Sequence, residues 1–197
     1  MGFKTITSNG NYIVTDKSDP FADLGLPVSG IGVRAKHVAL GRGYIQTTLT
    51  LDNVAQTVVN GTEYQGTKIY DFPECRMYVV GAVATLQQKT TSALASTLNA
   101  SSTGAIGLGT ATASATTLAT SMQDIIPTTA FTSSATVNVA GTAVSAVLAA
   151  AAFFDGTGTA KDLYLNTAYA TTGDVDADAT QTISGTVVIT WQNLGDK

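Results

Sequence analysis

Apolar and hydroxyl side chains alternate with near-strict period two between Gln181 and Trp191. Successive side chains of a strand point to opposite faces of a sheet, so this alternation predicts a strand with one buried face. The opposite face is predicted to be lined by Thr and Ser. The buried face is predicted to consist of Ile183, Gly185, Val187, Ile189 and Trp191.

Three further segments predict β structure. Residues 44–51 alternate in the same way, whereas residues 76–86 are apolar at both odd and even positions. A strand that is apolar on both faces is typical of the centre of a sandwich. The apolar run 144–154 meets the turn signal of residues 155–158, and residues 161–166 then return, which predicts a β-hairpin.

One short helix is predicted over residues 116–126. Leu118, Met122 and Ile125 have helical spacing there, and Pro127 would end the helix.

Residues 1–30 show no sustained period and mix Gly, Asn, Asp and Pro with isolated large apolar residues. We interpret them as an extended N-terminal arm, and residues 31–197 as a single β-sandwich domain. The arm cannot bury its own aromatic side chains, so it packs either along its own domain or on a neighbouring subunit. The sequence leaves both alternatives open.

The segment from Thr90 to Ala160 carries only two charges, Asp124 and Asp155, and no cation. Disordered chains combine low hydrophobicity with high net charge, whereas this chain is 44% hydrophobic and 12% charged, with a mean hydropathy of +0.20. Thr and Val favour strands because they are β-branched. The composition therefore predicts an all-β protein with a β-sandwich or jelly-roll-like body, whose charge-poor segment lies against other protein.

Charge and hydropathy also indicate which classes of partner the chain does not bind. The net charge of −4 divides into +1 over residues 1–89 and −5 over residues 90–197, without the clustered Lys and Arg that nucleic-acid binding requires. The run 144–154 is shorter than the roughly 20 residues of a membrane span, and residues 1–6 have no signal-peptide core. We expect a protein made in the cytoplasm that binds neither nucleic acid nor membrane.

Candidate catalytic residues are few. His37 and Cys75 are the only His and Cys, and nucleophilic catalysis needs a nucleophile beside a base. His37 stands in a predicted strand flanked by cations and is interpreted as structural or exposed. Cys75 is interpreted as a small buried hydrophobe. We expect no enzymatic activity and no cofactor.

One acidic segment, with Asp174, Asp176 and Asp178, has the spacing that begins a calcium-binding loop. Ala179 stands where that loop needs Gly, and Gly185 stands where it needs Glu. The segment is therefore interpreted as a solvated acidic loop, and no metal site is expected.

The stretches AAFFDGTGTAKDLYLN (151–166) and ISGTVVITW (183–191) resemble small structural proteins of tailed bacteriophages, in particular head decoration or cement proteins. The resemblance is confined to the C-terminal β region. It implies a β-rich body on the outer capsid surface of the virion that binds the major capsid protein, commonly as a homodimer or trimer. A protein that binds only the expanded shell would stabilise that shell by linkage.

This resemblance implies that the arm reaches across capsid subunits and that residues 90–160 bury against sister subunits, since interface cores are poor in charge. The predicted partner-binding residues are Phe3, Tyr12, Phe21, Leu24 and Leu26.

The main alternative is a head fibre or receptor-binding module that holds host glycans. Its candidate residues are Tyr164, Asn166 and Tyr169. A tail or neck component is a further alternative.

Overall fold

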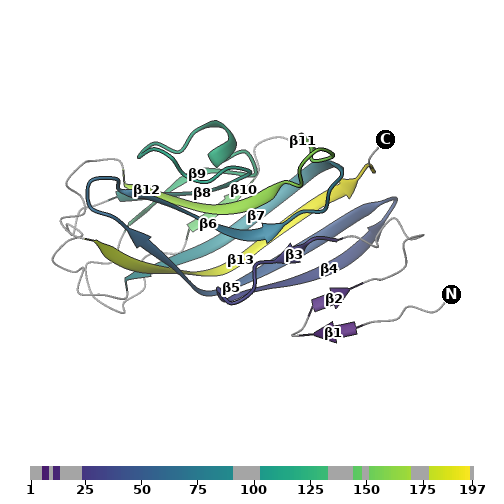
Figure 1. The fold of residues 1–197 in the computed structure, drawn as a ribbon, viewed down its shortest axis with the longest axis horizontal. Helices are drawn as coiled ribbons and strands as arrows, with labels where there is room; N and C mark the ends of the chain where they lie inside the picture. The colour runs from purple at the N-terminus through teal and green to yellow at the C-terminus, as the bar shows by residue number, and fades with distance from the viewer. Residues whose placement is uncertain are drawn as a thin grey trace.

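The protein is an antiparallel β-sandwich of two layers (Figure 1). The computed structural model describes residues 6–8, 11–13, 24–90, 103–132, 144–147, 151–169 and 178–195. The predicted all-β fold is confirmed.

The larger sheet has six strands. They are β4 (Val33–Gly41), β5 (Tyr44–Val58), β7 (Arg76–Thr90), β10 (Val144–Val147), β11 (Ala152–Asp155) and β13 (Ala179–Asn193). The order is β10-β7-β13-β5-β4, and β11 pairs with another part of β7. The C-terminal strand β13 thus lies in the centre, between β5 and β7.

The smaller sheet has five strands. They are β3 (Leu26–Pro27), β6 (Tyr64–Asp71), β8 (Thr103–Gly109), β9 (Ile126–Thr132) and β12 (Asp162–Tyr169). The order is β3-β6-β12-β8-β9, and every pairing is antiparallel.

The core lies between the sheets and follows the predicted alternation. On β13, the side chains of Ile183, Val187, Ile189 and Trp191 are fully buried. Trp191 meets Phe72 edge to face, with the ring centroids 5.7 Å apart. The predicted buried face of this strand is confirmed, apart from Gly185, which lies at a bulge.

The predicted hairpin of residues 144–166 is wrong. The apolar run forms two strands, β10 and β11, which pair with β7, whereas β12 pairs with β6 and β8 of the other sheet. The turn after Asp155 therefore carries the chain from one layer to the other. Local turn chemistry indicates a reversal of direction, but it does not determine which strand becomes the hydrogen-bonded neighbour.

The predicted helix over residues 116–126 is also wrong, since this segment contains a single 3₁₀ turn, Thr120–Met122. Carbonyls of this segment are bonded from outside it: the Ser121 carbonyl accepts the N–H of Ala111 at 2.9 Å, and the Met122 carbonyl accepts from Asn166 Nδ2 at 2.8 Å. These nonlocal partners take the place of helical ones. Pro127 belongs to β9.

Strand β7 is confirmed, but it is not buried on both faces. Its inward residues are buried, whereas Tyr78, Val80 and Val83 on the outward side are 37%, 36% and 45% exposed. No described segment therefore covers the outer face of the six-stranded sheet over these residues.

Part of the N-terminal arm is described. Strands β1 (Ile6–Ser8) and β2 (Asn11–Ile13) form a small antiparallel hairpin, with β2 beside β4 (Figure 1). Farther along, Leu26 and Pro27 pair with β6 of the same chain, and the N–H of Val28 donates to the carbonyl of Ile69 at 3.2 Å. Residues 26–28 thus pack along their own domain.

Within the described part of the chain, no helix is both long and apolar enough to cross a membrane.

Candidate partner-binding surface

The two outer faces of the sandwich differ in what covers them. Residues 110–125, here called the flap, leave β8 and re-enter the fold at β9 after lying on the outer face of the five-stranded sheet. A small apolar cluster packs the flap onto that sheet. Its members are Tyr64, Ala113, Leu118, Met122 and Ala168.

Asn166 on β12 fixes the flap through three hydrogen bonds. Its Oδ1 accepts from the backbone N–H of Ala113 at 2.8 Å. Its Nδ2 donates to the carbonyls of Ala111 at 2.9 Å and Met122 at 2.8 Å. The Asn166 side chain is fully buried; its bond to Ala113 is buried, and the other two are partly buried. Buried polar groups satisfied in this way contribute to stability and are costly to leave unpaired.

Two further features shape the flap: a bond between its two ends, and a close approach to the sheet. The Asp124 carboxylate accepts from the backbone N–H of Thr110 at 2.8 Å and from its hydroxyl at 2.7 Å. At Gly66 on β6, a Cβ atom would lie 2.2 Å from Thr112 Oγ1 and 2.7 Å from the Ala113 nitrogen. Glycine at this position therefore allows the flap backbone to approach the sheet.

The outer face of the six-stranded sheet carries a band of uncharged side chains, here called the neutral band. One cross-strand row runs from Phe153 through Tyr78 and Gln192 to Tyr44, and the next joins Thr190, Gln46 and Val38. Adjacent strands lie about 4.8 Å apart, so these rows place the side chains next to one another. The apolar and aromatic members of the band are Val38, Leu40, Tyr44, Tyr78, Val80 and Phe153.

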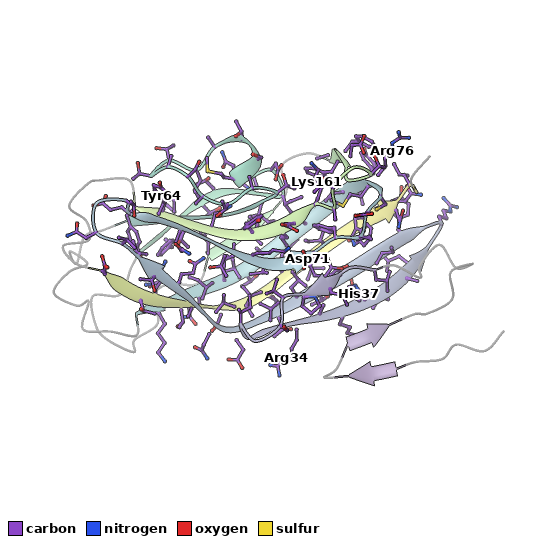
Figure 2. All side chains as sticks on the ribbon, in the orientation of Figure 1. Arg34, His37, Tyr64, Asp71, Arg76 and Lys161 are labelled. Carbon is purple, nitrogen blue, oxygen red and sulfur yellow. The ribbon has the colours of Figure 1, made fainter. Side chains whose placement is uncertain are left out.

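The neutral band is bounded by charged side chains. Arg76 faces Asp155 at 4.0 Å beside the Tyr78–Phe153 row, and on β4 Arg34 faces Asp52 at 3.8 Å. Arg34 and Arg76 project from different margins of the sheet in Figure 2. The band thus combines apolar and uncharged polar side chains inside a charged border, and depletion of charge in the core is usual for a protein interface.

Formal charge differs between this face and the remainder of the described chain. By strand alternation the outer face of the six-stranded sheet holds four cations, Arg34, Lys36, Arg76 and Lys89, and two carboxylates, Asp52 and Asp155, giving +2. The other described residues hold three cations and six carboxylates, giving −3.

An ion cluster lies on the five-stranded sheet. Lys68 contacts Asp71 and also Asp162, the latter at 2.9 Å, and these hydrogen bonds raise the pKa of Lys68 to about 12. The Tyr164 hydroxyl donates to Asp162 at 3.1 Å. The cluster joins β6 to β12 and gives this side of the molecule more carboxylates than cations.

His37 lies on β4 at the seam between the two sheets, 6.1 Å from the ring of Tyr70 (Figure 2). Its Nδ1 is 3.1 Å from Thr47 Oγ1, which also accepts the indole N–H of Trp191 at 3.0 Å. The Thr47 hydroxyl can therefore donate to Nδ1, which fits a neutral imidazole. Burial lowers the pKa of His37 to about 4, and its contacts are those of a structural residue.

The residues predicted to bind the partner lie as follows. Leu24 packs against the core of its own domain, and its carbonyl accepts a hydrogen bond from the Tyr70 hydroxyl. Leu26 is 53% exposed on β3. Tyr12 belongs to β2, but its side chain lies outside the described residues, as do Phe3 and Phe21 entirely.

The residues considered for glycan binding do not form an exposed rim. Asn166 and Tyr169 are buried, and Tyr164 is half-buried beside Asp162. Cys75 is buried, as predicted.

In the acidic segment, Asp174 and Asp176 lie outside the described residues, and Asp178 accepts the N–H of Asn60 at 3.0 Å. Across the described ranges, no group of three His, Cys, Asp or Glu residues is placed to hold a metal ion.

The neutral band was missed by the sequence reasoning. One signal for it existed, because residues 76–86 are apolar on both faces, and the outward half of that pattern was assigned to a core. The contributions of Phe153, Tyr44 and Val38 depend on strand order, which the sequence pattern does not specify.

Comparisons with protein-family models, curated proteins and solved structures found no match to this chain.

Proposed function

We propose that this chain is a non-catalytic virion structural protein that decorates and stabilises the outer surface of a bacteriophage capsid by binding the major capsid protein. The observation that carries this proposal is the neutral band on the open face of the six-stranded sheet. Interface cores are enriched in aromatic residues and depleted of charge, as this band is. The C-terminal resemblance to head decoration proteins supplies the partner and the location.

In this proposal the neutral band, rather than the arm alone, contacts the capsid. The flap covers part of the opposite face, whereas Tyr78, Val80 and Phe153 of the six-stranded sheet are exposed. The arm and a homodimer or trimer remain parts of the proposal, with β1 and β2 available for contacts beyond the sandwich.

The test is co-sedimentation of the purified protein with expanded, empty phage capsids that lack it. We expect saturable binding at a fixed ratio to the major capsid protein. Phe153→Asp should weaken this binding by at least about tenfold, since it replaces the most exposed aromatic side chain of the band with a charge. Thr117→Asp, an exposed position on the flap, is the control and should bind like the wild type. Equal binding by both variants would contradict the role of the band.

A second candidate function rests on the chemistry of the same surface. Tyr44 and Tyr78 lie beside the amides of Gln46 and Gln192, and aromatic rings next to uncharged amides can also hold neutral sugars. A head fibre or receptor-binding module would use the band in this way. Two results together would favour this alternative. The folded protein would bind glycans on an array but not capsids, and Tyr78→Ala would lose the glycan binding.

A further inference from the structure

We infer that the protein surface bound by the neutral band carries an excess of negative charge around its apolar centre. This inference rests on the proposed function, since it describes the partner of that same surface. It follows from the distribution of charge over the sandwich rather than from the band alone.

Counted over the described residues, the open face carries +2, although the chain as a whole carries −4. Its two carboxylates lie opposite Arg34 and Arg76, so the surplus charge comes from Lys36 and Lys89. Lys36 is exposed on β4 and, in the described part of the chain, belongs to none of the ion pairs. Its ammonium group is available to a carboxylate of another molecule.

The same distribution argues against a second copy bound face to face. A two-fold contact sets the same patch of both subunits against itself. Such a contact would place two faces of charge +2 together, whereas an acidic partner would meet complementary charge. Complementary charge at an interface speeds association and disfavours wrong partners.

Exposed charges at the rim act over short distances in salt solution. The Debye length is about 10 Å at 0.1 M salt and about 3 Å at 1 M, so binding should weaken as salt increases. The apolar centre contributes independently of salt, so binding should not disappear. Partial salt sensitivity is therefore the expected signature.

The experiment measures capsid co-sedimentation of the full chain at 50 mM and 500 mM NaCl for four proteins: wild type, Lys36→Gln, Lys36→Glu and Thr117→Glu. Lys36→Gln and Thr117→Glu have the same net charge but alter opposite faces. At low salt we expect about threefold weaker binding for Lys36→Gln and about tenfold for Lys36→Glu. Thr117→Glu should stay within about twofold of the wild type, and high salt should reduce all differences to about twofold.

The outcomes separate the two proposals. Saturable binding that is insensitive to salt, or equally weak binding by Lys36→Gln and Thr117→Glu, overturns the acidic partner and leaves capsid decoration intact. Absence of binding by the folded wild type at both salt concentrations overturns decoration and this inference together. Thermal unfolding of each variant establishes that a loss of binding is not a loss of fold.

Discussion

The two outer faces of this sandwich differ in whether other residues of the chain cover them. Part of the five-stranded sheet is covered by the flap, which Asn166 bonds to the sheet and whose backbone approaches closely at Gly66. The six-stranded sheet carries aromatic and aliphatic side chains that no described segment covers. The comparison shows that a charge-poor chain can cover apolar side chains of one outer face with its own residues while those of the other face stay exposed.

Of the substitutions considered, Asn166→Ala on the covered face should destabilise the protein most. It removes three hydrogen bonds of a buried side chain and leaves flap backbone groups unpaired, so the free energy of unfolding should fall by about 3 kcal/mol. Gln192→Ala on the open face removes one exposed bond, from Nε2 to the Arg42 carbonyl, and should cost less than about 0.5 kcal/mol. Urea denaturation measures both. Equal losses would show that the flap is not held by Asn166.

A pair of glycines compares the faces without removing a hydrogen bond. Gly66→Ala forces a Cβ against the flap backbone and should destabilise the protein by about 2 kcal/mol. At Gly81, on the open face, an added Cβ meets nothing within 4 Å, so Gly81→Ala should change stability by less than about 0.5 kcal/mol. Hydrogen exchange of flap amides should increase only in the first variant. Unchanged exchange in Gly66→Ala would contradict the close approach.

The seam between the sheets should respond to acid through His37. Its folded pKa of about 4 is below the ordinary 6.5, so the unfolded chain takes up the proton first. Stability from this group is full above pH 6.5 and is lost as the pH falls toward 4, by about 2 kcal/mol between pH 7 and pH 5. His37→Gln should lose that part of the pH dependence in denaturation series. Parallel pH profiles for wild type and variant would contradict the buried neutral imidazole.

Two valines of β7 give the finest comparison, because they differ mainly in the face they occupy. Val79→Thr buries a hydroxyl in the core and should cost about 1.5 kcal/mol. Val83→Thr keeps the shape of an exposed side chain and should cost less than about 0.5 kcal/mol. A large thermal destabilisation by Val83→Thr would mean that the open face is covered within the single chain.

Several features of the fold could be predicted from local sequence. The alternation of β13 identified its buried face, and the β-branched composition identified the fold class. The hairpin and the helix were predicted wrongly because their local signals compete with nonlocal pairing: β11 finds its partner on β7, and the flap finds its partners on Asn166.

Less of the candidate site could be predicted from local sequence. Leu24 and Leu26 were proposed as isolated apolar residues of an arm, whereas Leu24 packs against the core and Leu26 belongs to a strand that pairs with β6. The neutral band joins Phe153, Tyr78 and Tyr44 from three distant segments. Its existence depends on which strands become neighbours.

The sequence by itself determined that this chain forms β structure with apolar and hydroxyl faces, because side-chain alternation and β-branching act over a few residues. Only the tertiary structure decided which of these faces would be covered. That outcome depends on long-range pairing and on close contacts such as the flap at Gly66, which arise when segments distant in sequence pack together. The neutral band and its positive rim are products of that packing.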